Sequence, residues 1–242
     1  RLDSAGTVSG GVPLLLVCTL CCAPAAGGLF LLLARKTNGA ASALQEGTGA
    51  SKRTFWLTFG ALLLCWLPYY LAYFPGMFNY DSAGEAAQFT TGQYNGAFPP
   101  LHTLLLAAFY WLGGAVGSYN AGIALYTAAQ ACAAAAALAY ANALLCRRGV
   151  KRGFRVLLAA AYGLLPGFPL LVMSTTKDLF FCAALLPLLC LLAEGGREPE
   201  RLKKRGYAAA VVLLTALSCL LRPNGAAAIG MALIFGWFLM PR

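Results

Sequence analysis

The sequence predicts an all-α protein, a polytopic transmembrane helical bundle in which residues 1–242 form a single transmembrane domain. Hydrophobic residues make up 60% of the 242 residues and charged residues only 11%, whereas charged residues are about 25% of a soluble domain. Apolar runs of membrane-spanning length recur along the chain, and short basic clusters separate them. No hydrophilic stretch is long enough to form a separate soluble domain.

The net charge of +10 excludes one class of partner once its distribution is considered. In a soluble protein such an excess would suggest nucleic acid. Here the bases lie in short clusters between apolar runs, at residues 35–54, 147–155 and 195–206, as is typical of cytoplasmic loops. We therefore expect a multi-pass membrane protein, with membrane lipid as a partner and no nucleic acid.

The number of crossings follows from these basic loops. The apolar runs cover residues 12–34, 55–74, 101–116, 120–146, 156–173, 179–193, 207–221 and 225–240. The three basic loops share one side of the membrane only if either 101–116 or 120–146 does not cross. The run 101–116 follows a proline pair and is interrupted by Gly113-Gly114, so we expect it to form an outer juxtamembrane helix. About seven spanning helices result, with the loop 75–119 outside.

A different topology remains open from the sequence. If 101–116 crosses the membrane, there are eight spanning helices and one basic loop lies outside. Asp81 and Asp178 would then lie on opposite sides of the membrane. Cysteine-accessibility labelling at Gly92 distinguishes the two arrangements.

The outer loop carries acids but no Lys or Arg between residues 75 and 99. Ser82 and Glu85 match the S-x-x-E capping box, so we expect a short helix to begin at Ser82. Asp81 precedes this helix, between Tyr80 and a helix that carries Gln88. A solvated loop acid is the plain interpretation. The alternative is that Asp81 is an ionised carboxylate acting as a general base on an acceptor hydroxyl.

Two further polar segments supply the remaining candidate functional residues. His102, the only histidine, follows a proline pair and is either a hydrogen-bonded structural group or a ligand for substrate. Thr175 and Asp178 fit a helix-capping pattern, so Asp178 is either a helix start or a second functional acid. Lys177 is the only base in that turn. With seven crossings, Arg222 lies on the same side of the membrane. Two carboxylates and two isolated cations suit a hydroxyl acceptor and a phosphate leaving group, or a divalent ion shared by the acids.

In the order and spacing of these motifs, residues 55–225 resemble the GT-C superfamily of membrane glycosyltransferases. The protein O-mannosyltransferase and lipid A aminoarabinose transferase branch is the most similar. Y-D-S-A-G-E-A-A-Q with F-P-P-L-H-T also resembles an uncharacterised group of bacterial multi-spanning proteins. This chain has Ser82 where that branch often has a second adjacent acid, and Phe98 where the uncharacterised group tends to have histidine.

The resemblance implies a catalytic acid at Asp81, a second acid at Asp178 and an interfacial helix that begins at P-P-L-H. It also implies a donor sugar carried on a polyprenyl phosphate and transfer to a hydroxyl on the outer membrane face. Further helices and another outer loop are expected after Arg242, so we expect the chain to be part of a longer protein.

We therefore hypothesise a membrane glycosyltransferase of the cell envelope. Asp81 is the general base, and Asp178 orients the acceptor or a metal ion. The lipid phosphate is held by Lys177, Arg222 and His102, and the neighbouring substrate-binding candidates are Glu85, Gln88 and Tyr80. One alternative is a transporter or lipid-translocating protein, for which the break at 166–169 is the relevant feature. The other is a non-catalytic scaffold.

Overall fold

A computed structural model describes residues 48–94, 96, 98–222 and 225. Within these residues the chain is helical and has no strand; Met77 and Ser174 form an isolated bridge. Apart from residues 148–150, the described residues belong to one compact unit. The predicted all-α class is confirmed. The apolar run 12–34, and 225–240 beyond its first residue, lie outside the described residues.

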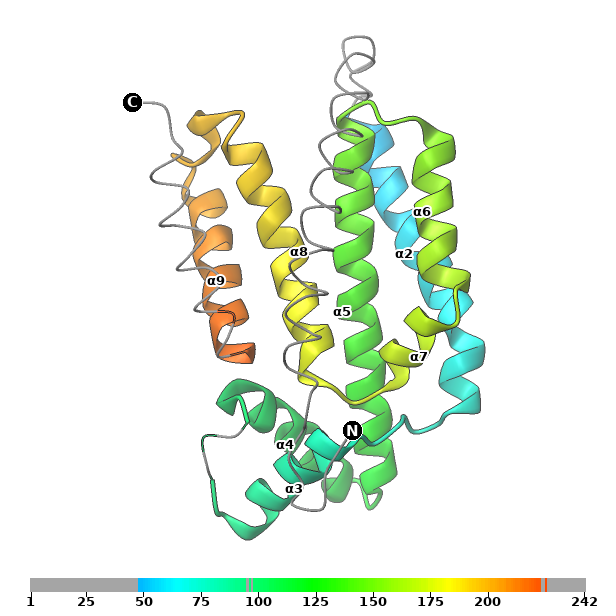
Figure 1. The fold of residues 1–242 in the computed structure, drawn as a ribbon, viewed down its shortest axis with the longest axis vertical. Coiled ribbons are helices and arrows are strands. Elements are labelled where there is room, and N and C mark those ends of the chain that lie inside the picture. Colours follow the sequence, from blue (N-terminus) through cyan, green and yellow to red (C-terminus); the bar gives the residue numbers. More distant parts are fainter. Residues whose placement is uncertain (1–47, 95, 97, 223–224, 226–242) are drawn as a thin grey trace, which may run out of the picture. The chain divides into compact units, whose positions relative to one another are not determined.

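Nine elements follow one another along the described chain (Figure 1). They are α2 (Thr48–Ala72), α3 (Tyr80–Thr91), α4 (Pro100–Ala115), α5 (Tyr119–Arg147), α6 (Arg152–Leu164), α7 (Gly167–Met173), α8 (Lys177–Gly195), the 3-10 turn η2 (Pro199–Arg201) and α9 (Arg205–Leu221). Helix α5 contacts α2, α4, α6, α7 and α8, so it is the central helix of the bundle.

Three helices are long and apolar enough to cross a membrane, namely α2, α5 and α8. Helices α6 and α7 qualify together as a fourth span, although the chain bends by 55° between them. Pro166 lies at this bend and has no backbone N–H to continue the ladder, so the predicted break is confirmed. Helix α9 is apolar but has 17 residues. The described part of the chain therefore holds three or four candidate membrane spans.

Small residues let α5 occupy the centre. Its buried positions include Ala131, Ala134 and Ala135, which pack against Leu62 and Trp66 of α2. Because lipid supplies no hydrophobic drive between helices, close approach over small side chains is a main source of packing energy in a membrane. Alanines of α5 therefore let α2 pack closely against it.

Helix α4 differs in one respect from the sequence prediction. Gly113 and Gly114 do not interrupt α4, which runs without a break from Pro100 to Ala115. A Cβ on Gly113 would lie 2.6 Å from the backbone nitrogen of Gly122. The glycine therefore allows α4 to touch the start of α5, and its role is packing rather than breaking the helix.

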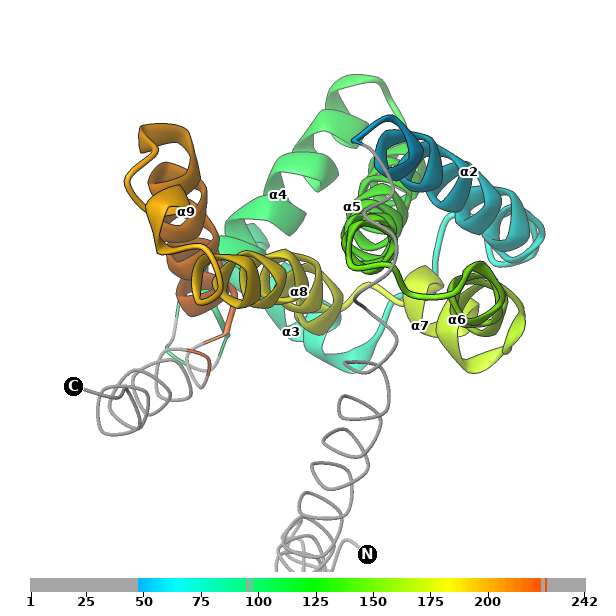
Figure 2. The same ribbon diagram turned by 90° about the horizontal axis from the view of Figure 1, so that it is seen from above.

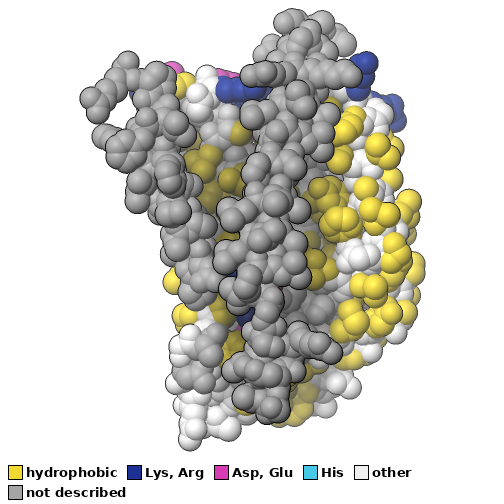
Figure 3. All heavy atoms as spheres, viewed as in Figure 1, with side chains coloured by type: hydrophobic (Ala, Val, Ile, Leu, Met, Phe, Trp, Pro, Cys, Tyr) yellow, Lys and Arg dark blue, Asp and Glu magenta, His cyan; other side chains and the backbone are white. Residues whose placement is uncertain are grey.

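The two ends of the bundle are distinct. Figure 2 looks nearly along the axis of α5, whereas α4 runs sideways in the same view. Helix α4 is therefore steeply inclined to α5, and it contacts α3. The basic segments gather at the opposite end, where Arg147 bonds to Ser51 and Glu194, and Arg155 bonds to Thr54. Hydrophobic side chains cover much of the flank between the ends, and the visible Lys and Arg side chains lie mainly at one end (Figure 3). This distribution is typical of a membrane protein.

Candidate functional site

Helix α3 begins two residues earlier than the capping box predicted. Asn79 is the N-cap, and its Oδ1 accepts a hydrogen bond of 2.8 Å from the Asp81 amide. Asparagine is among the best N-cap residues, so Asn79 fills, three residues earlier, the N-cap role that Ser82 was expected to have. Asp81 therefore lies in the first turn, where the helix dipole favours a negative charge.

Ser82 instead joins the outer loop to the segment before α8. Its hydroxyl donates to the Thr175 carbonyl oxygen at 2.5 Å. The Thr175 amide donates to the Met77 carbonyl at 2.9 Å, and the Met77 amide donates to the Met173 carbonyl at 2.8 Å. These bonds fix residues 77–82 against residues 173–175, although nearly one hundred residues separate them in the chain.

This junction brings Asp81 beside Lys177. Lys177 Nζ lies 2.5 Å from Asp81 Oδ2, and the Asp81 side chain remains 44% exposed. The ammonium group also lies 5.6 Å from the centre of the Phe98 ring, a cation–π distance. The loop 75–99 carries no base of its own, and the neutralising cation comes from the start of α8.

Asp178 forms a second ion pair next to the first in sequence. Thr176, one residue later than predicted, is the N-cap of α8, and its Oγ1 accepts from the Asp178 amide at 3.3 Å. Arg222 Nη1 lies 3.3 Å from Asp178 Oδ1, and the Asp178 side chain is 46% exposed. Within the described residues, Asp178 Oδ1 receives no hydrogen bond of good geometry. This oxygen is itself buried, with the Arg222 guanidinium as its ionic partner, so the exposed surface of the side chain belongs to its other atoms.

A divalent ion shared by the two acids does not fit this arrangement. Asp81 faces Lys177 and Asp178 faces Arg222, so a metal would have to displace a cation from each carboxylate. In the part of the chain that the structure describes, no group of three or more His, Cys, Asp or Glu side chains could hold a metal ion. We therefore give a metal no role at this site.

His102 and Glu85 are completely buried, so substrate does not reach either of them in this structure. His102 Nδ1 lies 2.6 Å from Glu85 Oε2, and Nε2 lies 2.6 Å from the Tyr126 hydroxyl. The chain of bonds continues from Tyr126 to Gln130 Oε1 at 3.1 Å. Burial follows from the apolar surroundings of α4 and α5, which exclude water from the imidazole and make a partner for each polar atom necessary.

Gln130 links this buried series of hydrogen bonds to the segment that precedes α8. Its Nε2 donates to the carbonyls of Val172 and Ser174, both at 2.8 Å. Its oxygen therefore accepts from Tyr126, and Tyr126 accepts from His102 Nε2. Nε2 of His102 is then the donor to Tyr126, and Nδ1 lies within hydrogen-bond distance of the Glu85 carboxyl group. The network holds the segment that ends in Lys177 and Asp178, and its members are positioning residues.

The sequence interpretation missed Tyr126 and Gln130. Their signal was a pair of large polar residues at i, i+4 inside an apolar run. Such side chains point the same way from a helix and need partners within the bundle.

The two remaining candidates lie on one face of α3. Tyr80 is 91% exposed, and Gln88 is buried. Both line an open groove along the helix, and the Phe98 ring forms part of the same wall. Tyr80 and Gln88 thus lie beside the Asp81–Lys177 pair and not inside the buried network.

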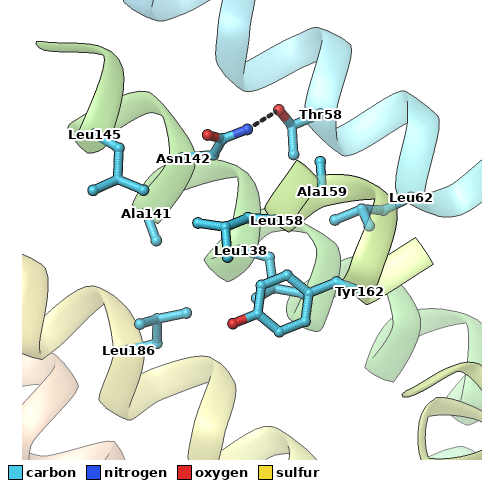
Figure 4. Close-up of a pocket in the computed structure, with 10 residues that line it drawn as sticks. All are labelled: Thr58, Leu62, Leu138, Ala141, Asn142, Leu145, Leu158, Ala159, Tyr162 and Leu186. Atoms are coloured by element: carbon cyan, nitrogen blue, oxygen red, sulfur yellow. Dashed lines mark hydrogen bonds between the residues drawn. The ribbon is translucent and has the colours of Figure 1, made fainter. Parts of the chain in front are cut away.

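A separate cavity of about 130 Å³ lies in another part of the bundle, between α2, α5, α6 and α8 (Figure 4). Its lining is mainly leucine and alanine, and Asn142 Nδ2 donates to Thr58 Oγ1 at 2.8 Å beside it. None of the described residues that line it is an acid or a base.

At that opposite end, the sequence interpretation missed a buried acid. The Glu194 side chain is only 4% exposed and lies 3.2 Å from Arg147 Nη2 and 3.5 Å from Arg201 Nη1. The Tyr140 hydroxyl also donates to it, at 3.4 Å. The signal was a lone glutamate closing an apolar run just before a basic loop, where a charge needs an internal partner.

Comparison with known proteins gives one match. Residues 95–238, more than half of the chain, match the model of a family of unknown function, DUF6020. The match includes Lys177, Asp178 and Arg222, and it begins after α3. No curated protein and no solved structure matches the chain significantly.

Proposed function

We propose an activity for this chain, which belongs to the DUF6020 family. It is an integral-membrane glycosyltransferase of the GT-C type that moves a sugar from a polyprenyl-phosphate donor to a hydroxyl acceptor. The observation that carries the proposal is the pair of half-exposed ion pairs, Asp81–Lys177 and Asp178–Arg222. They offer two carboxylates and two cations at one end of an apolar bundle. Inverting sugar transfer to an alcohol needs one group of each kind, a base and a cation for the leaving phosphate.

In the proposed reaction, the acceptor oxygen attacks the anomeric carbon of the donor sugar. Its proton passes to the Asp81 carboxylate as the new carbon–oxygen bond forms. The bond between the anomeric carbon and the phosphate oxygen breaks, and the electron pair leaves with the polyprenyl phosphate. Arg222 and Lys177 meet the charge on that phosphate, since charge-assisted hydrogen bonds to phosphate are among the strongest in proteins.

The Asp81–Lys177 contact supports an order of events. Lys177 cannot bind a phosphate fully while its ammonium group is 2.5 Å from Asp81 Oδ2. A donor phosphate that attracts Lys177 therefore releases the carboxylate to accept a proton. The Asp178 side chain is 46% exposed beside its ion pair with Arg222, and we assign it the role of orienting the acceptor hydroxyl.

The membrane arrangement is part of the proposal. Five of the predicted crossings correspond to α2, α5, α6 with α7, α8 and α9, which run in alternate directions (Figure 1). With residues 12–34 and 225–240 added, seven spans result. The basic end then faces the cytoplasm and the α3 end faces outward, in the bacterial cytoplasmic membrane. Helix α4, which extends across the bundle, is the outer juxtamembrane helix.

A transfer assay tests the proposal. Purified protein is incubated with radiolabelled polyprenyl-phosphate mannose or aminoarabinose and with an extract of the cell envelope as acceptor. We expect Asp81→Asn to lower transfer by about 10²–10⁴-fold, the usual contribution of a general base. Thr90→Ala is the matched control, because the Thr90 hydroxyl is exposed and donates only to backbone carbonyls of α3. Equal rates in wild type and Asp81→Asn would remove Asp81 from the role of base.

The bend between α6 and α7 favours a second candidate, a transporter or lipid-translocating protein, since broken helices line the sites of many transporters. Uptake of labelled lipid-linked sugar into proteoliposomes without chemical change would favour this candidate. The bend lies at the end of α6 that is nearer to α3 (Figure 1). Transport sites lie near the midplane instead, so the geometry favours the transferase.

A further inference from the structure

The groove along α3 has the composition of a binding site that the ion pairs do not explain. Its volume is about 520 Å³ and it is open to solvent. Gly84 and two alanines form its floor, and Tyr80 and Phe98 are its aromatic walls. Gln88, Gln93 and Thr91 add two amides and a hydroxyl. No charged side chain of the described residues lines it.

The floor is shaped by the absence of a side chain at Gly84. A Cβ there would lie 2.5 Å from the Phe98 ring. Phe98 therefore rests directly on the α3 backbone, and any larger residue at position 84 would displace it. Lys177 Nζ lies 5.6 Å from the centre of the same ring. A rigid aromatic surface thus ends at the Asp81–Lys177 pair.

Helical phase places Asp81 at the edge of this groove. Asp81 precedes Gly84 by three residues and Gln88 by seven, so the three positions follow one stripe of the helix. Tyr80 and Thr91 lie on the same side of α3, whereas Glu85 points into the buried network. A molecule in the groove therefore has its end beside the Asp81 carboxylate.

The lining selects an uncharged molecule that is rich in hydroxyl groups. Exposed aromatic rings offer flat apolar faces, on which the C–H faces of a sugar ring can lie. The amides both donate and accept, so they match hydroxyl groups, which do the same. An anion would find no cation among the described residues that line the groove, and a purely hydrocarbon chain would leave the polar groups of Gln93 and Thr91 unused.

We propose that the groove of α3 binds a neutral carbohydrate and is the acceptor subsite of the transferase. The assignment as acceptor subsite rests on the proposed function, whereas carbohydrate binding itself does not. The acceptor sugar lies between Tyr80 and Phe98, with the hydroxyl group that reacts directed toward Asp81. The acceptor is therefore a neutral saccharide rather than an acidic sugar, a lipid or a serine side chain.

Saturation-transfer NMR tests the binding with detergent-solubilised protein and four probes at millimolar concentration: the methyl glycosides of mannose, glucose, galactose and N-acetylglucosamine. We expect at least one probe to bind wild type and Tyr80→Ala to weaken that binding at least fivefold. Tyr94→Ala is the matched control, because Tyr94 is an exposed tyrosine outside the groove lining. Tyr80 is almost fully exposed, so its removal does not threaten folding.

Three outcomes overturn the inference. The first is that none of the four glycosides binds wild type. The second is that Tyr80→Ala and Tyr94→Ala weaken binding equally. The third is that methyl glucuronide binds in the groove and the neutral glucoside does not.

The transfer assay separates this inference from the proposed function. If glycosides bind in a Tyr80-dependent way but no sugar is transferred, the proposed function fails and the carbohydrate site stands. If transfer occurs, Tyr80→Ala should raise KM for the acceptor at least fivefold and leave kcat and the KM of the lipid donor unchanged. An effect on the donor KM alone would place the acceptor elsewhere.

Discussion

The two ends of the bundle use the same residue types in opposite ways. At the basic end, Glu194 is 4% exposed and two arginines surround it. At the α3 end, Asp81 and Asp178 are 44% and 46% exposed, and each has one cation. A buried acid with two cations is fully committed to the fold, since removing a partner leaves a charge unpaired. A half-exposed pair contributes little to stability and can exchange its partner for a ligand.

The difference in exposure indicates which charged residues of this membrane protein are candidates for function. Four ion pairs or networks hold charge inside or near the bundle, and all of them satisfy a geometric definition of a salt bridge. Exposure of the acids separates them: the Glu85 and Glu194 carboxyl groups are closed to water, whereas the Asp81 and Asp178 side chains are open to it. We therefore expect substitutions at the closed pairs to change stability and substitutions at the open pairs to change activity.

The largest expected effect on stability comes from Glu194→Ala. It leaves Arg147 and Arg201 without their shared acid, although both arginines keep some contact with water. We expect the free energy of unfolding to fall by about 3 kcal/mol, the lower end of the range for breaking a buried pair. Glu200→Ala, which removes an exposed acid paired with Lys203, should cost less than about 0.5 kcal/mol.

Thermal unfolding in detergent, followed by circular dichroism, measures both of these variants. If Glu194→Ala and Glu200→Ala unfold at the same temperature, the claim that the basic end is structural is wrong. In neither variant should the KM of the lipid donor change.

A smaller effect is expected where α4 meets α5. A Cβ on Gly122 would lie 2.3 Å from the Phe109 carbonyl oxygen. Gly122→Ala should therefore destabilise the protein by about 1–3 kcal/mol, as overpacking does. Gly60→Ala is the matched control, because a Cβ on Gly60 of α2 meets nothing within 4 Å. That change should leave stability unchanged or raise it by up to about 1 kcal/mol; a loss in both variants equally would show that the close contact is not the cause.

The last prediction concerns binding of the donor phosphate by Arg222 and is read from kinetics rather than from stability. Arg222→Gln removes the charge beside Asp178 and one charge-assisted contact to the donor, worth about 1.5–3 kcal/mol. We expect the KM of the polyprenyl-phosphate donor to rise roughly tenfold or more, since each 1.4 kcal/mol is about a factor of ten. Arg197→Gln removes an exposed arginine at the basic end and should leave that KM unchanged. Equal donor KM values in wild type and Arg222→Gln would exclude Arg222 from phosphate binding.

The sequence predicted the larger features because they depend on composition and charge. The helical class, the bend at Pro166 and the meeting of the Asp81 and Asp178 loops all follow from apolar runs, prolines and basic clusters. The predicted start of α3 was wrong because two residues can each serve as its N-cap. Ser82 fits a capping box, yet Asn79 caps the helix, and the Ser82 hydroxyl reaches a carbonyl that is distant in sequence.

The partners of the charged groups also could not be predicted from the sequence. Lys177 neutralises Asp81 across nearly one hundred residues of chain, and Gln130 connects the only histidine to the turn before α8. Such contacts depend on how helices pack, and no periodicity within a single segment encodes them. The groove on α3 likewise depends on Phe98 resting on Gly84.

The proposals depend on one claim above all, that the α3 end and the basic end face opposite sides of the membrane. Cysteine labelling in spheroplasts tests it directly with Tyr94→Cys and Lys203→Cys, both at exposed positions. Tyr94 is preferable to Gly92, whose φ of +72° favours glycine. We predict that a membrane-impermeant maleimide labels Tyr94→Cys in intact spheroplasts and Lys203→Cys only after lysis. Labelling of both from the same side, or the reverse order, would contradict the account.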